Sequence, residues 1–136
     1  MTTLMAAIYS HLSAATGIAG LEFYHQETNQ GTPPPYAIMT EVMTERYPAY
    51  GMITNLRVSE ISLEDYATSD VDAASWAQVI IDALDGTYNI TIGSIRISNI
   101  NLTFESDAII DRQDGSGSSL FGRHLEFRVG WVQCST

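Results

Sequence analysis

The chain has 136 residues, 45% of them hydrophobic, which indicates one globular domain spanning residues 1–136. Its 16 acidic residues and six arginines give a net charge of −10, which argues against tight binding to DNA phosphates. No apolar run reaches the ~18 residues of a membrane span, and the start lacks the basic segment of a secretory signal. We therefore expect a soluble intracellular protein without a membrane partner.

The first third of the chain is predicted to form a helix and two strands. Residues 3–16 carry apolar side chains at helical spacing, with Thr2 or Thr3 as the N-cap and Gly17 at the end. A short strand is expected at 21–24, and a polar, proline-stiffened loop leads to a strand at 36–47. Both alternating faces of this second strand are apolar, which is typical of a central strand covered on both sides.

The strand expected at 53–65 changes phase in its middle, because its apolar residues are Leu56, Val58, Ile61 and Leu63. One extra residue near 59–60, a β-bulge, would keep all four on one face. The octapeptide LRVSEISL at 56–63 also matches IRISNINL at 95–102 in residue type at seven positions. Two strands with the same packing requirement explain this match, and a duplicated half-domain is the alternative.

The clearest predicted element is a second helix that begins after Ser69. Asp70 and Asp72 lie in its first turn, where the helix dipole favours anions, and Gly86 follows its end. Its apolar face consists of Ala73, Trp76, Ala77, Ile80 and Leu84. These features indicate a helix that packs one side against a sheet.

Three strands are expected after this helix. Tyr88, Ile90 and Ile92 alternate before a tight turn at 93–94, and a long arm at 107–123 then leads into the last strand. That strand has its apolar side chains on the inward face, at Phe121, Leu125, Phe127, Val129 and Trp131. Its outward side chains are His124, Glu126 and Arg128, while Arg123 interrupts the inward series.

The predicted element order is α-β-β-β-α-β-β-β. Strands that follow one another in runs favour a mainly antiparallel mixed sheet. The fold class is therefore α+β, with two helices packed on one face of the sheet and a long protruding β-hairpin.

No catalytic, cofactor or metal site is predicted. The three histidines lack metal-ligand spacing and a nearby nucleophile, and Glu64 and Asp65 are expected on opposite faces of a strand. The segment DRQDGSGS lacks the spacing of a calcium loop, although a weaker site using Asp107, Asp111 and Asp114 stays open. The single cysteine, Cys134, has no partner for an internal disulfide. We expect a protein that is not an enzyme.

Self-assembly is the function class that remains. A bulged strand, a long hairpin and the aromatic segment RYPAYG are usual parts of oligomers that exchange arms or extend sheets. Tyr47 and Tyr50 are candidate partner-binding residues because tyrosine provides a large contact area. A locally packed loop is the alternative for this segment.

The order of these segments resembles a known family. The helix LMAAIYSHLSA, the strand entry PPPYAIMTE, the helix DAASWAQVIIDAL and the ending DRQDGSGSSLFGRHLEFRVGWV follow one another over residues 4–132. They are similar to the tail terminator, or tail completion and head–tail joining, proteins of long-tailed phages and gene transfer agents. The individual motifs are soft, and the likeness lies in their order.

The resemblance implies a structural virion protein that forms a ring, usually hexameric, on the head-proximal end of the tail tube after assembly in the host cytoplasm. The ring stops tube polymerisation and offers a docking surface to the head connector, adaptor or stopper protein, and DNA passes through it without specific binding. Arg112, Asp114, Arg123 and Arg128 then become candidate residues of an inter-subunit or tube interface, with Tyr47 and Tyr50. An acidic lumen fits such a passage because it repels DNA.

Three alternatives are also compatible with the sequence. One is another neck or tail component, such as a connector adaptor or minor tail protein. Another is a small α+β ligand-binding module, which a deep apolar pocket with converging polar groups would support. The third is a hydrolase or metal-dependent enzyme, which needs a cluster of histidines and acids.

Overall fold

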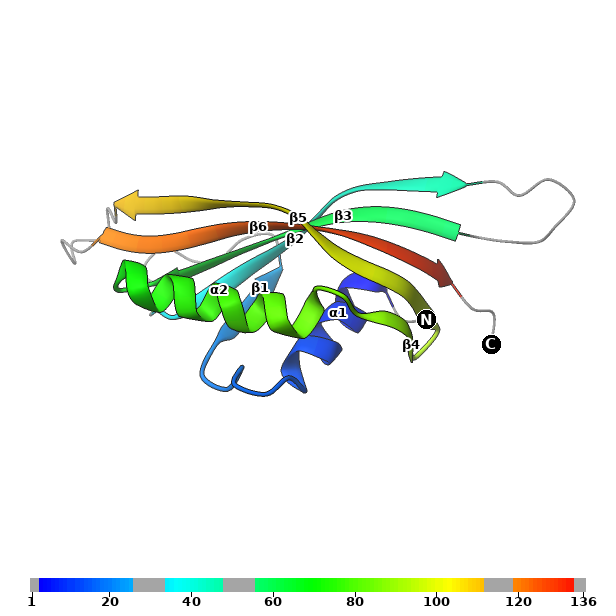
Figure 1. The fold of residues 1–136 in the computed structure, drawn as a ribbon, viewed down its shortest axis with the longest axis horizontal. Coiled ribbons are helices and arrows are strands. Elements are labelled where there is room, and N and C mark those ends of the chain that lie inside the picture. Colours follow the sequence, from blue (N-terminus) through cyan, green and yellow to red (C-terminus); the bar gives the residue numbers. More distant parts are fainter. Residues whose placement is uncertain (1–2, 26–33, 48–55, 112–118, 134–136) are drawn as a thin grey trace, which may run out of the picture.

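The computed structural model describes residues 3–25, 34–47, 56–111 and 119–133, and it confirms the predicted order of elements. Helix α1 (Leu4–Ser13) precedes strands β1 (Glu22–His25), β2 (Tyr36–Tyr47) and β3 (Leu56–Ala67). Helix α2 (Asp70–Leu84) follows, and β4 (Tyr88–Ile92), β5 (Ile95–Asp111) and β6 (Ser119–Gln133) complete the chain (Figure 1). No described helix is long and apolar enough to cross a membrane.

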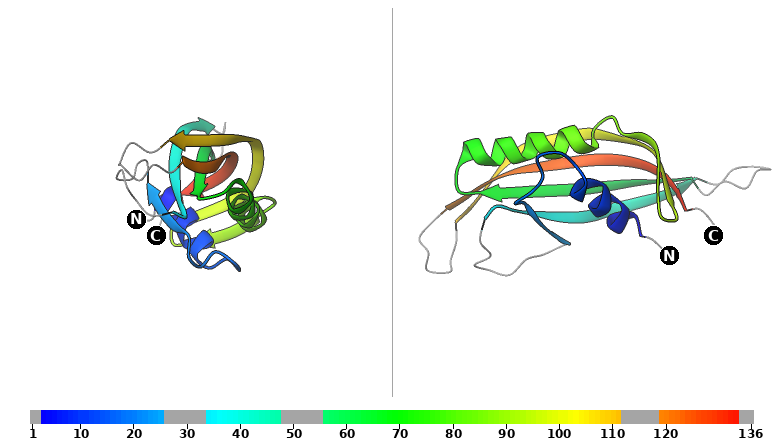
Figure 2. Two further views of the ribbon diagram at one scale, coloured as in Figure 1. Left: turned by 90° about the vertical axis from the view of Figure 1, so that its left-hand side faces the viewer. Right: turned by 90° about the horizontal axis from the view of Figure 1, so that it is seen from below.

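The six strands form one curled sheet in the order β1-β2-β3-β6-β5-β4. Only β1 and β2 pair in parallel, and the other neighbours are antiparallel, so the α+β mixed sheet is confirmed. Both helices pack on the same face of this sheet (Figure 2). We call that face the inner face and the opposite one the outer face.

Both helices begin at the side chains that the sequence indicates. The Thr3 hydroxyl accepts a hydrogen bond from the Ala6 backbone N–H at 3.2 Å, and the Ser69 hydroxyl accepts one from Asp72 at 3.1 Å. These caps satisfy backbone donors that lack a partner within the helix. Past the end of α2, Gly86 has a φ of +80°, which glycine adopts at little cost.

The hydrophobic core lies between the two helices and the inner face. The helices bury Leu4, Ala7, Ile8, Leu12, Ala73, Ala77, Ile80 and Leu84. From β6, Leu125, Phe127, Val129 and Trp131 enter the same core, as their alternation predicts. The central strand β6 therefore joins the two halves of the sheet under both helices.

The bulge expected near residues 59–60 of β3 is absent, which corrects the prediction. Strand β3 pairs with β6 in unbroken register from Leu56 to Ala67, and Leu56 and Val58 fall on the outer face. Register shifts instead lie between Glu41 and Met43 in β2 and between Ile97 and Asn99 in β5, with a further shift later in β5. The apolar residues of β3 thus lie on both faces of the sheet. The extra residue is in the neighbouring strand β2 instead.

The two matching octapeptides lie on either side of β6. Residues 56–63 belong to β3 and residues 95–102 to β5, and both strands pair with β6. In β5 the register shift places Ile95, Ile97, Ile100 and Leu102 in the core. The two segments therefore do not share one packing pattern, because Leu56 and Val58 lie on the outer face whereas their counterparts Ile95 and Ile97 lie in the core.

The expectation that β2 is covered on both sides along its length is wrong. Ala37 and Met39 are buried on the inner face, but residues 41–46 are all exposed. The far halves of β2 and β3 extend past α1 and α2, with β3 still paired to β6 along its other edge (Figure 1). We call residues 41–46 and 56–60 the β2/β3 arm. It lacks a covering helix because both helices end before they reach it.

Candidate functional site

The outer face of the sheet is covered by no described helix. Four large apolar side chains lie exposed on it, namely Val42 (57%), Met43 (44%), Leu56 (36%) and Phe104 (50%). Three of them belong to the β2/β3 arm. Exposed apolar residues gathered on one face are typical of a contact surface for another macromolecule.

A chain of polar side chains crosses the outer face near Phe104. The His124 Nδ1 lies 2.8 Å from Glu64 Oε1, and its Nε2 lies 3.1 Å from Glu126 Oε1. The Tyr66 hydroxyl donates to the other carboxylate oxygen of Glu64 at 2.5 Å. The Phe104 ring stands edge-on to His124, with 6.2 Å between the ring centroids. Residues from β3, β5 and β6 are thereby linked.

Two opposing influences set the pKa of His124. Burial lowers the pKa of His124, but hydrogen bonds to Glu126 and Glu64 and the charges of these carboxylates outweigh it and raise the pKa above 6.5. The raised pKa means that the protonated imidazole is bound more favourably in the folded state than in the unfolded state. Its contribution to stability is complete below pH 6.5 and is lost as the pH rises through the folded-state pKa.

We expect His124→Gln to lower the free energy of unfolding at pH 5.5 by about 0.5–1 kcal/mol, and by less at pH 8.5, because both carboxylates are partly exposed and solvent screens them. Urea denaturation at the two pH values measures the difference. His25→Gln is the matched control, since His25 is exposed at the end of β1. An equal loss at both pH values contradicts an ionic role for His124.

A second apolar cluster lies on the outer face across β1, β2 and β3. The ring centroids of Tyr24 and Tyr36 are 6.2 Å apart, and those of Tyr36 and Tyr66 are 5.4 Å apart. Tyr66 lies over Gly122 of β6, where an added Cβ would come within 2.7 Å of its ring. Gly122 therefore makes room for the aromatic cluster.

On the inner face, Arg123 lies among three carboxylates. It hydrogen-bonds Asp107 and lies 3.2 Å from Glu105, and it faces Asp65 across the β3–β6 pair. Neither carboxylate oxygen of Asp65 nor the Arg123 Nε has a hydrogen-bond partner among the described residues. Burial raises the pKa of Asp65 to about 7, and the nearby backbone N–H of Asp65 itself and the charge of Arg123 oppose this only in part. Asp65 is thus a buried acid that titrates near neutral pH.

The predicted interface residues fall in three places. Arg128 is exposed on the outer face, as its alternation predicts. Arg123 is instead engaged with acids of its own chain on the inner side. Tyr47 ends β2 with a side chain outside the described part, and three further candidates, Tyr50, Arg112 and Asp114, lie outside the described residues. Cys134 lies outside them too.

The described residues contain no group of three or more histidines, cysteines or acids able to hold a metal ion. Of the residues considered for a weak metal site, Asp107 pairs with Arg123, while Asp111 has an undescribed side chain and Asp114 lies outside the described residues. His11 lies 3.0 Å from the Ala83 carbonyl and links α1 to α2. These placements leave the outer face as the candidate site.

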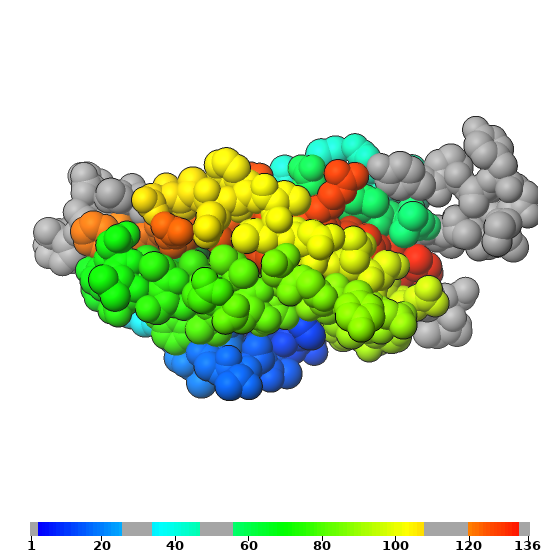
Figure 3. Space-filling view, in the orientation of Figure 1, coloured from blue at the N-terminus to red at the C-terminus, as the bar shows by residue number. Residues whose placement is uncertain are grey.

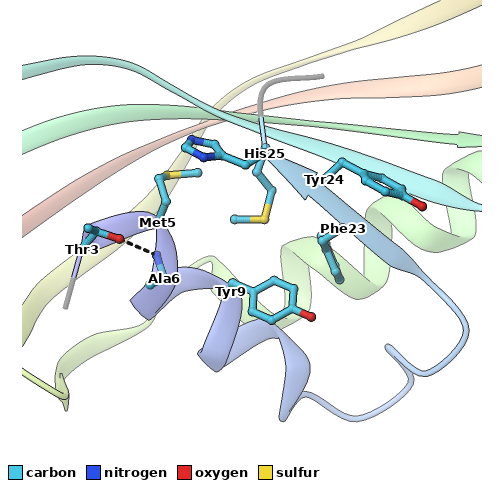
Figure 4. A pocket seen from close by; sticks show the side chains of 8 residues that line it. Thr3, Met5, Ala6, Tyr9, Phe23, Tyr24 and His25 are labelled. Atoms are coloured by element: carbon cyan, nitrogen blue, oxygen red, sulfur yellow. Dashed lines mark hydrogen bonds between the residues drawn. The ribbon is translucent and has the colours of Figure 1, made fainter. Parts of the chain in front are cut away.

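A cavity of about 310 Å³ lies between α1 and the edge of the sheet (Figure 4). Its lining consists of Thr3, Met5, Ala6, Tyr9, Phe23, Tyr24, His25 and Met39. The Thr3 hydroxyl is already used as the helix cap. The remaining lining is mostly apolar, and the volume is at the small end of ligand sites.

The comparisons with known proteins agree with the fold. No family model matches the chain, and no curated protein matches it by sequence. Among solved structures, the chain is similar to one from the virion of a native gene transfer agent particle, with a TM-score of 0.65 and 15% identity. The match covers 95% of this chain and 94% of that chain. The α+β architecture described above is therefore shared, along almost its full length, with a chain of a virion.

Proposed function

We propose that this protein is a structural component of a virion, and more specifically a tail terminator. In this role, copies form a ring, expected to be hexameric, on the head-proximal end of the tail tube. The ring stops tube polymerisation and presents a docking surface to the head connector, adaptor or stopper protein. DNA then passes through the ring without specific binding, because the subunits carry a net charge of −10 each.

One observation carries the proposal. The fold is shared over nearly the whole of both chains with a chain of the gene transfer agent virion. The uncovered outer face supports it, because it offers exposed apolar side chains to neighbours. The β2/β3 arm supports it too, since the predicted aromatic segment at 47–51 follows directly after this arm.

Imaging of the purified protein in negative stain, alone and with tail tubes of the particle that encodes it, tests this function. We expect rings, and tubes capped at one end. In a polymerisation assay with tube protein, the caps are expected to stop growth, so that mean tube length falls as the protein concentration rises. Tubes that bind the protein along their sides, or that grow equally long in its presence, contradict a terminator.

The same fold supports a second role in the particle. A connector adaptor or another neck protein would also form rings, but it would bind isolated connectors and leave tube length unchanged. The ligand-binding alternative depends on the cavity between α1 and β1. It predicts saturable binding of apolar small molecules that a Met39→Trp substitution abolishes without loss of ring formation.

A further inference from the structure

The arginines of this acidic chain are unevenly placed. Arg57 lies over the Trp131 ring at 4.8 Å, and Arg123 is engaged by Glu105 and Asp107. Arg96 and Arg128 are exposed instead, and their side chains form no hydrogen bond or ion pair with any described residue. Their register in β5 and β6 places both on the outer face.

The exposed side of α2 has the opposite character. It is formed by Asp72, Ser75, Gln78 and Asp82, and the helix contains no basic residue. Because the opposite side of α2 packs on the inner face, this acidic stripe points away from the sheet. Figure 3 shows α2 in green at the front of the molecule, and Figure 2 shows that α2 lies on the same side of the sheet as α1, opposite the outer face.

The spacing of the charges matches between these two surfaces. Asp72 and Asp82 are ten residues apart in α2, which is about 15 Å along the helix axis and about 80° around it. Arg96 pairs with Val132, four residues from Arg128 along β6, so the two arginines lie about 14 Å apart when the strand spacing is included. Two aspartates on one copy can therefore face two arginines on another.

We propose that α2 of one copy docks on the outer face of β5 and β6 of the next copy, with Asp72 opposite Arg128 and Asp82 opposite Arg96. In this orientation Val71, which is 74% exposed, lies toward Phe104, which is 50% exposed. The apolar contact supplies affinity, and the charge pairs set register and the rate of encounter.

This contact rests on the proposed ring and specifies its geometry. The two surfaces differ and lie on opposite sides of the molecule, so the contact is heterologous. Each added copy leaves one α2 surface and one β5/β6 surface free, until the last copy closes the ring. Local pairing of opposite charges also offsets the repulsion between subunits that each carry −10.

Charge reversal tests the pairing. We expect Arg128→Glu and Asp72→Arg each to raise the concentration needed for half-maximal assembly by about tenfold or more, and the double variant to return to within about threefold of the parent protein. Native mass spectrometry over a dilution series measures the assembly. Asp70→Arg is the matched control, because it makes the same charge change in the same helical turn but about 200° around the helix from Asp72.

The outcomes separate the contact from the ring. Rings that form equally well with either single reversal overturn the contact and leave the ring intact. If both single variants lose ring assembly and the double variant does not regain it, Asp72 does not pair with Arg128. A parent protein that forms no ring, alone or on tubes, overturns the proposed function and the contact with it.

A chemical cross-link provides a measurement that does not depend on charge reversal. In a Cys134→Ser background, Asp72→Cys and Arg128→Cys are combined in one chain and treated with a bismaleimide of about 10 Å reach. We expect a ladder of covalent multimers that ends at the ring size, and only monomers when either cysteine is omitted. Circular dichroism confirms that each variant is folded. Monomers from the double-cysteine chain under ring-forming conditions overturn the contact.

Discussion

Replacing Asp65 with asparagine is expected to stabilise the protein at pH 8 by on the order of 3 kcal/mol. The carboxyl group is fully buried, and at pH 8 it is ionised without a hydrogen-bond partner among the described side chains. Its pKa rises from 3.8 to about 7 on folding, and each unit corresponds to about 1.4 kcal/mol. Asparagine has nearly the same shape and no charge, so it removes the cost of burying the anion.

The raised pKa of Asp65 determines how the free energy of unfolding changes with pH. Between about pH 4 and pH 7 the folded state keeps a proton on Asp65 that the unfolded chain has released. The free energy of unfolding therefore falls as the pH rises through this window, and it levels off above pH 7 as far as Asp65 is concerned. Asp65→Asn is expected to remove this slope, leaving a smaller decline above pH 6.5 that belongs to His124.

Urea denaturation of both proteins at pH 4.5, 6 and 8 tests the prediction. The control is Asp107→Asn, which removes an exposed carboxylate that contacts the same arginine. It is expected to change stability by less than about 1 kcal/mol, as a surface ion pair does. A destabilised Asp65→Asn variant at pH 8 would mean that the charge of Arg123 favours the ionised carboxylate more than burial disfavours it.

The sequence predicts the elements well and the register less well. Helix caps depend on a few adjacent residues, which is why Ser69 could be identified from the sequence as the cap of α2. A bulge depends on the partner strand as well. The phase change in 56–63 predicts a bulge in that strand itself, but the extra residue lies in β2, opposite Glu60. Local patterns indicate that an irregularity exists, and pairing decides which strand contains it.

For the candidate site too, the sequence predicts the local orientation of side chains but not their partners in other strands. The opposite orientations of Glu64 and Asp65 follow from strand alternation and are confirmed by their partners, His124 on the outer face and Arg123 on the inner face. Their association with β6 could not be predicted, because it joins residues about 60 positions apart in the chain. The exposure of the β2/β3 arm was missed for a related reason. Val42, Met43 and Leu56 give it apolar side chains like those of a covered strand, and only the folded chain shows that no described helix lies over them.

Two buried glycines of β6 are expected to differ in how much a substitution destabilises the protein, because the surrounding packing differs. At Gly122 an added Cβ would lie 2.6 Å from the backbone oxygen of Asp65 and 2.7 Å from the Tyr66 ring. At Gly130 it would meet the side-chain oxygen of Asn99 at 2.5 Å. Asn99 is exposed, so its side chain can turn away, whereas a backbone carbonyl in the middle of a sheet cannot.

Gly122→Ala is therefore expected to lower the free energy of unfolding by about 2–3 kcal/mol, and Gly130→Ala by less than about 1 kcal/mol. Thermal unfolding followed by circular dichroism measures both, with an expected fall in Tm of about 8 °C for the first. Adding Tyr66→Ala to Gly122→Ala removes the ring but leaves the carbonyl in place, so it should restore little stability. Equal losses of stability at the two glycines would contradict this prediction. They would mean that β3 can move away from β6 at Gly122 at little cost, despite the aromatic cluster on the outer face.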